Sequence, residues 1–162
     1  MFGLQRTSYL TATIARHIKP SIRTFSITPA TQSRFTDFTN SLKSTVKTMT
    51  GAEVNAHINE DPSYGPRVDY HLIDIREPYE WNEEHIPGAV YLGRGVLERD
   101  LASIAKPTDT VVLYCQSGPR SLISADNLQR MGYKNVYIVE GGLARYKKQY
   151  GTQLNPKGMI EE

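Results

Sequence analysis

The stretch TVVLYCQSGPRS, residues 110–121, carries signals for a strand, a loop and the start of a helix. Residues 110–115 are rich in valine, leucine and tyrosine, which is typical of a strand buried on both faces. Gly118 permits backbone conformations that other residues resist, and Pro119 fits the first turn of a helix, where its missing N–H costs nothing. The only cysteine of the chain, Cys115, is therefore predicted to lie where a buried strand ends.

The same alternation of strand and helix signals runs through the chain from about residue 45. Further short strands are expected at 45–49, 71–75, 89–92 and 135–139. Helix starts are expected at the capping box that begins with Thr50, at Pro78 and at Gly141-Gly142. This order predicts an α/β fold, a mostly parallel five-stranded sheet with helices on both faces. In such folds chemistry gathers at the carboxyl ends of the strands, where Cys115 is expected.

Composition excludes several classes of protein. No apolar run approaches membrane-spanning length, so no membrane partner is expected. A single cysteine rules out an intramolecular disulfide framework, and the four histidines have no paired ligand spacing, so neither a metal nor another cofactor is predicted. Five of the 19 basic residues precede the first acidic residue, Asp37, which leaves 14 basic and 17 acidic residues in 37–162. That balance gives no support for a nucleic-acid binder.

The first part of the chain has the composition of a targeting sequence. Residues 1–36 are basic, free of acidic residues and rich in serine and threonine, as mitochondrial transit peptides are. Leu10, Ile14 and Ile18 would line one stripe of a helix. We expect a transit peptide or disordered segment at 1–36, the folded domain at 37–152 and a tail at 153–162, with the mitochondrial matrix as the location. An ordinary disordered basic tail is the alternative.

Cys115 has surroundings that favour a reactive thiolate. The backbone amides of residues 116–121 can curl around the sulfur, and the helix that begins near Pro119 directs its positive end at them. Arg120 adds a permanent cation, and Ser121 can donate a hydroxyl hydrogen bond to the sulfur. The alternative is that Cys115 is a small buried hydrophobe, as free cysteines often are. The run Cys-x-x-Gly-x-Arg between a strand and a helix favours a nucleophile.

Cys115-Gln116-Ser117-Gly118-Pro119-Arg120-Ser121 resembles the active-site loop of the rhodanese, or thiosulfate sulfurtransferase, family. A second family signature is similar to residues 72–81 and 85–89, LIDIREPYEW and HIPGA. Residues 93–98 and 139–142 also resemble family segments, so the similarity spans about 45–150 in the right order. The chain departs from the pattern at Glu84, where glycine is usual, and at Tyr146, where tryptophan is usual.

The resemblance implies a role for each site residue. Cys115 is expected to be the catalytic nucleophile, and residues 116–121 the substrate-binding loop. Arg94, in a glycine-flanked loop, is expected near the pocket, where it could attract an anionic donor. Asp74, Arg76 and His85 are expected to be structural residues near the site. Pro119 is expected to stiffen the loop while it removes one amide from the ring around the sulfur.

The implied reaction moves the outer sulfur of thiosulfate, or of a persulfide, to Cys115 and then to a thiol such as glutathione or a protein thiol, or to cyanide. Two alternatives stay open: a Cys-dependent phosphatase or arsenate reductase of the Cdc25 type on the same fold, and a non-catalytic sulfur-carrier or binding module. Those phosphatases have a Cys-x5-Arg loop, whereas Cys115 and Arg120 are separated by four residues. The shorter loop fits one sulfur atom and crowds a phosphate. Oligomeric state is not predicted.

Overall fold

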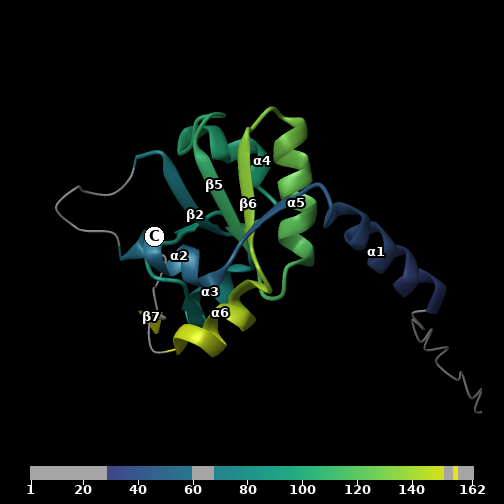
Figure 1. Ribbon diagram of the computed structural model, residues 1–162, viewed down its shortest axis with the longest axis horizontal. Helices are drawn as coiled ribbons and strands as arrows, with labels where there is room; N and C mark the ends of the chain where they lie inside the picture. Colours follow the sequence, from purple (N-terminus) through teal and green to yellow (C-terminus); the bar gives the residue numbers. More distant parts are fainter. Residues whose placement is uncertain (1–28, 60–67, 152–154, 157–162) are drawn as a thin grey trace, which may run out of the picture.

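The computed structural model describes residues 29–59, 68–151 and 155–156. Its centre is a five-stranded sheet with the strand order β1-β6-β5-β2-β4, in which every neighbouring pair is parallel. Figure 1 shows this sheet between helices that lie on its two faces. The predicted α/β fold with a parallel five-stranded sheet is therefore confirmed.

The strands and helices alternate along the chain. The main sheet consists of β1 (Lys47–Met49), β2 (Tyr70–Asp74), β4 (Val90–Tyr91), β5 (Thr110–Tyr114) and β6 (Asn135–Val139). The α-helices are α1 (Pro29–Leu42), α2 (Gly51–Ile58), α3 (Pro78–Glu83), α4 (Leu97–Asp100), α5 (Pro119–Arg130) and α6 (Gly142–Tyr150). A 3-10 turn, η2 (Leu101–Ser103), continues α4, and a small antiparallel pair joins β3 (Glu84–His85) to β7 (Asn155–Pro156).

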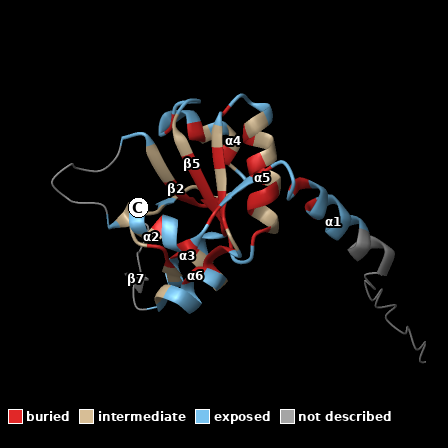
Figure 2. Ribbon diagram, in the orientation of Figure 1, coloured by how far each residue is buried: buried red, intermediate tan, exposed pale blue. Residues whose placement is uncertain are grey.

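The core consists of two clusters, one on each face of the sheet. Successive side chains of a strand point to opposite faces. Accordingly Val111 and Leu113 of β5 join the cluster that contains residues of α4 and α5, whereas Val112 and Tyr114 join the cluster with α2 and α6. Figure 2 shows the buried residues concentrated along β5 and the inner side of α5. Both faces of the central strand are thus covered, as its apolar run predicted.

Most expected elements are present, with strand ends shifted by one or two residues. The capping box forms: the Thr50 hydroxyl accepts the Glu53 N–H, and Glu53 accepts the Thr50 N–H at 2.7 Å. Pro78 and Pro119 each begin a helix. The sequence did not predict α1, which runs across the expected domain boundary at residue 36, or α4. Residues 1–28 lie outside the described residues.

The topology brings three loops to one edge of the sheet. Because β2, β4 and β5 are parallel, the segments that follow Asp74, Tyr91 and Tyr114 all emerge at the carboxyl edge. The Ile75 N–H donates to the Tyr114 carbonyl oxygen at 3.1 Å, which joins the ends of β2 and β5. Cys115 therefore lies at the edge where α/β proteins place their sites. Within the described ranges, no helix has the length and apolar character needed to span a membrane.

The packing of α5 generates a first prediction. Leu128 is fully buried in the cluster on the α4 and α5 face, whereas Met131, one turn later, is 51% exposed. Leu128→Ala removes apolar contacts and leaves a cavity, so we expect a loss of about 2–5 kcal/mol in the free energy of unfolding. Met131→Ala is the matched control and should change it by less than about 0.5 kcal/mol. Urea denaturation of both variants measures the difference; equal effects would contradict this packing.

Candidate active site

The thiol of Cys115 lies at the end of β5, at the start of the loop that leads into α5. The residue is 1% exposed, and its Sγ accepts a hydrogen bond from the Gly118 N–H at 3.2 Å. This contact requires the backbone to turn back on itself within three residues, and Gly118 makes that turn with φ +114°. The helix α5 begins directly after it, so the positive end of the helix dipole lies at the sulfur side of the loop.

A second helix, α6, holds the other side of the loop. The N–H groups of Leu143 and Ala144 donate to the carbonyl oxygens of Cys115 and Gln116, at 2.9 and 3.0 Å. Gly142, at φ +62°, allows this approach, because a Cβ atom at that position would lie 2.4 Å from the Cys115 oxygen. The first turn of α6 thereby fixes the direction of two peptide units of the loop.

Arg120 makes a bidentate ion pair with Glu80 of α3. Its Nη1 and Nη2 donate to Oε2 and Oε1 of Glu80 at 2.7 and 2.9 Å, with the arginine side chain 30% exposed and the glutamate 14%. The arginine lowers the pKa of Glu80, and Glu80, followed by Cys115, raises the pKa of Arg120. The guanidinium is thus held by the carboxylate of α3 through two hydrogen bonds.

Asp74 and Arg76 form a second, fully buried pair at the end of β2. Arg76 Nε donates to both carboxylate oxygens of Asp74 at 3.1 and 3.0 Å, and Nη2 donates at 2.8 Å. Arg76 also donates to the carbonyl oxygen of Glu84, and its Nη1 reaches Oε1 of Gln116 at 3.4 Å. These bonds tie the strand end to the β3 segment and to the loop.

The remaining predicted residues are placed differently from one another. Ser121 is buried, and its hydroxyl has no hydrogen-bond partner among the described residues. Arg94 is held by its backbone N–H, which donates to the Ile75 carbonyl oxygen at 3.2 Å. Its side chain is exposed and makes no ion pair within the described part of the chain.

His85 stacks on Trp81 with ring centroids 3.6 Å apart and faces the Trp81 carbonyl, so it packs in the core. Gln116 and Ser117 are exposed on the loop.

Comparison with known proteins places this loop in a family. The model of the rhodanese-like domain matches residues 50–149, which contain β2, β5 and the whole Cys115 loop. The chain belongs to the rhodanese-like domain family. A thiosulfate sulfurtransferase, GlpE of Tolumonas auensis, is 34% identical over 79 residues, which cover 49% of this chain and 74% of that protein.

Two further matches are a longer protein and a solved structure. The probable adenylyltransferase/sulfurtransferase MoeZ of Mycobacterium tuberculosis is 33% identical over 79 residues, 48% of this chain, and the chain spans only 20% of that protein. A solved protein of unknown function from Rhodopseudomonas palustris, described as a possible tyrosine phosphatase, is 29% identical with a TM-score of 0.57. That match covers 71% of this chain and 89% of the other.

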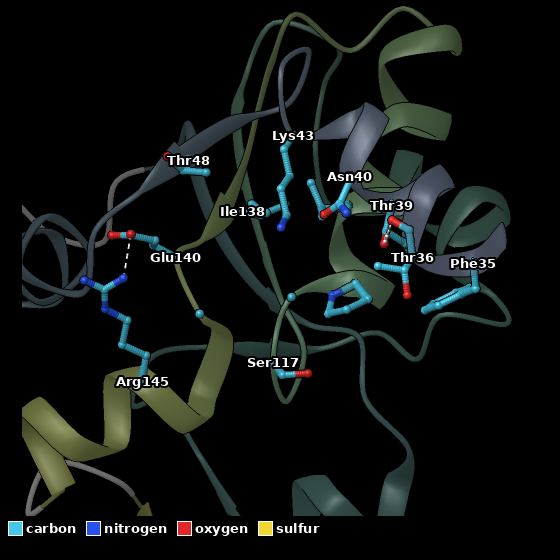
Figure 3. A pocket seen from close by; sticks show the side chains of 14 residues that line it. Phe35, Thr36, Thr39, Asn40, Lys43, Thr48, Ser117, Ile138, Glu140 and Arg145 are labelled. Carbon is cyan, nitrogen blue, oxygen red and sulfur yellow. Dashed lines mark hydrogen bonds and ion pairs between the residues drawn. The ribbon is translucent and has the colours of Figure 1, made fainter. Parts of the chain in front are cut away.

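The rhodanese-like domain has a cavity beside the loop (Figure 3). Its volume is about 590 Å³, and Ser117, Gly118 and Pro119 form part of its lining. The opposite wall comes from α1, and the rim carries the ion pair of Arg145 with Glu140. Cys115 is not among the lining residues. Helix α1 precedes the matched segment, so this wall is an addition to the part of the chain that the family model matches.

Two residues of the rhodanese-like site were missed by reasoning from the sequence. Glu80 was recognised only as part of a motif, although it holds Arg120 from 40 residues away. Gly142 was assigned only to a helix start. Its missing side chain also lets the first turn of α6 approach the carbonyl groups of the Cys115 loop. The Gly141-Gly142 pair was the available signal for a close backbone approach. The residues around Glu80 in the sequence carry no signal for its contact with Arg120.

The position of Gly142 yields a second prediction. Gly142→Ala places a Cβ against the Cys115 carbonyl at a left-handed φ, so we expect a loss of about 2 kcal/mol or more in the free energy of unfolding and a lower reactivity of Cys115. Gly151, just after α6, has φ −53° and open space around its Cα. Gly151→Ala is therefore the control and should retain both properties. Urea denaturation and thiol alkylation rates measure them.

The Glu80–Arg120 pair predicts a pH dependence of stability. The folded protein lowers the pKa of Glu80 from 4.5, so its stabilisation is present at neutral pH and is lost as the pH falls below that value towards the folded pKa. Glu80→Gln should therefore be less stable than the wild type at pH 7, and the two should converge in acid. Glu83→Gln, an exposed residue of the same helix, should match the wild type at neutral pH. Urea denaturation across this pH range tests it, and a constant gap would refute it.

Proposed function

We propose that this rhodanese-like domain is a sulfurtransferase that uses Cys115 as its nucleophile. The substrate is a donor with a transferable outer sulfur, thiosulfate or a persulfide. The acceptor is a thiol such as glutathione, a protein thiol or cyanide. The observation that carries the proposal is the buried Cys115 Sγ, which accepts the Gly118 N–H within a Cys-x4-Arg loop. Relatives named thiosulfate sulfurtransferase support the same reaction class.

The reaction follows from the atoms around the sulfur. The Cys115 thiolate attacks the outer sulfur of the donor, and a new S–S bond forms to Sγ. The bond between the two donor sulfurs breaks, and sulfite, or a thiolate when the donor is a persulfide, leaves with the electron pair. The Cys115 persulfide then loses its outer sulfur to the acceptor, which returns the thiolate. Two half-reactions through one covalent intermediate give ping-pong kinetics.

The loop supplies the stabilisation that a persulfide anion needs. The Gly118 N–H and the positive end of α5 are already in position before the reaction, and Arg120 lies in the first turn of the same helix. Both outer nitrogens of Arg120 are engaged by Glu80. A phosphatase of this type needs that guanidinium to bind the phosphate oxygens, so the pair favours sulfur over phosphate as the transferred group.

We also propose the mitochondrial matrix as the location of the protein. The support is the composition of residues 1–36, which contain basic residues and no acidic ones.

A mass measurement tests the proposed function. After incubation with thiosulfate, the intact protein should gain the mass of one sulfur atom, and cyanide should remove it as thiocyanate. Cys115 is the only cysteine, so the position of the adduct is unambiguous. Cys115→Ser should gain no sulfur and should lose turnover, with its unfolding transition retained because the two side chains are of similar size.

One control checks that the adduct depends on the Cys115 thiol, and a second assay tests the phosphatase alternative. Wild-type protein alkylated with iodoacetamide before thiosulfate is added should behave like Cys115→Ser. An aryl phosphate serves as the substrate for the phosphatase reading. Hydrolysis of that ester by the wild type, together with no sulfur adduct from either thiosulfate or a persulfide, would overturn the sulfurtransferase proposal.

A further inference from the structure

Glu80 brings a negative charge to the rim of the Cys115 loop. Its carboxylate lies in α3, accepts both outer nitrogens of Arg120 and remains 14% exposed. Arg120 lies in the first turn of α5, five residues after Cys115 and directly after the loop that Cys115 begins. The ion pair therefore fixes the Glu80 carboxylate against the loop that carries the sulfur, and a donor that reaches Cys115 enters the field of both Glu80 and Arg120.

The charges at this edge balance before any substrate arrives. Arg76 is neutralised by the buried Asp74, and Arg120 is neutralised by Glu80. After Arg120, the charge of Arg76 makes a smaller contribution to lowering the pKa of Glu80. When Cys115 is a thiolate, these five groups carry a net charge of −1. Arg94 is exposed on the same edge, with no ion pair to a described residue.

We propose that Glu80 is a specificity-determining residue that selects sulfur donors by charge. It makes the site disfavour dianionic donors such as thiosulfate relative to donors with one negative charge, including persulfides and thiosulfonates. The inference rests on the proposed function and adds to it the charge class of the donor. Glu80 acts both through its own carboxylate and by holding Arg120 away from full contact with the donor.

Two donors of similar shape isolate the effect of charge. Thiosulfate and methanethiosulfonate share the same S–S bond, but a methyl group replaces one charged oxygen in the second. Each transfers its outer sulfur to Cys115 and releases the rest of the molecule, as sulfite and as methanesulfinate respectively. Attraction by Arg94 is present in every variant tested below, so it does not alter comparisons between them.

The choice of Glu80→Gln preserves the local fold. Besides binding Arg120, Glu80 closes the capping box of α3, because its Oε2 accepts the Glu77 N–H at 3.1 Å. Glutamine serves in the same capping position, so the substitution removes the charge and leaves the helix start. Glu83→Gln removes a charge from the same helix at an exposed position that has no ion pair to a described residue, and is the matched control.

The first measurement does not depend on enzyme activity. Iodoacetamide is neutral and iodoacetate is an anion, and both alkylate a thiolate with loss of iodide. We expect the iodoacetate-to-iodoacetamide rate ratio at Cys115 to rise about tenfold in Glu80→Gln, the size expected when one like charge is removed from a partly exposed site. The ratio should stay within about twofold of the wild type in Glu83→Gln. It should also stay near the wild type in Glu80→Asp, which keeps the charge.

The second measurement uses the donors themselves. The ratio of kcat/KM for thiosulfate to kcat/KM for methanethiosulfonate should rise about tenfold in Glu80→Gln and stay unchanged in Glu83→Gln. A purely structural role of Glu80 would lower the rates with both donors equally and leave this ratio alone.

The outcomes are distinct. Unchanged ratios in folded Glu80→Gln would overturn the charge filter, even if total activity falls. A wild type that turns over neither donor would refute the proposed function, while the alkylation ratio still decides the role of Glu80. If Glu80→Gln does not fold, two comparisons decide: the wild-type alkylation ratio should lie below that of the same chain in urea, and Glu80→Asp should keep it low. An equal ratio in urea, or a rise in Glu80→Asp, would contradict the proposal.

Discussion

The hydrogen bonds from α6 to the loop carbonyls of Cys115 and Gln116 constrain the rest of the site. The carbonyl of one residue and the N–H of the next point in opposite directions across a planar peptide unit. Once Leu143 and Ala144 hold these two carbonyls, the N–H groups of the following residues must point away from α6. The backbone then turns at Gly118, whose N–H reaches Sγ. A helix late in the chain thus determines how the loop presents its amides.

The two arginine–carboxylate pairs have different tasks because they differ in burial. The Asp74–Arg76 pair is almost fully removed from water, with 0% of the Asp74 and 3% of the Arg76 side chain exposed. Burying two charges is costly unless each is paired and hydrogen-bonded, and here the additional bonds reach the β3 segment and the loop. The Glu80–Arg120 pair is partly exposed to solvent, with 14% of the glutamate and 30% of the arginine side chain accessible. The Glu80 carboxylate is therefore close enough to solvent to influence which sulfur donors bind.

The sequence allowed accurate prediction wherever the signal was local. The β5 and β6 runs, the Thr50 capping box and the helix starts at Pro78 and Pro119 each depend on residues within a few positions of one another. Helix α1 was missed because its first turn has no acidic residue and it begins inside a basic segment with a different interpretation. The Glu80–Arg120 contact and the approach of α6 to the loop depend on tertiary structure. Neither follows from the spacing of residues along the chain.

The position of α1 separates what this chain shares with its family from what it adds. The family match, residues 50–149, contains the sulfur, the loop and both ion pairs, so the elements that bear on the chemistry belong to the shared domain. Helix α1 precedes that segment, packs against α5 and completes the cavity whose other wall is Ser117–Pro119. Leu42 of α1 joins the same core cluster as Cys115, which anchors this wall to the domain. The surroundings of the loop therefore differ from the shared domain on the α1 side, while the charge pattern on the α3 side comes from within it.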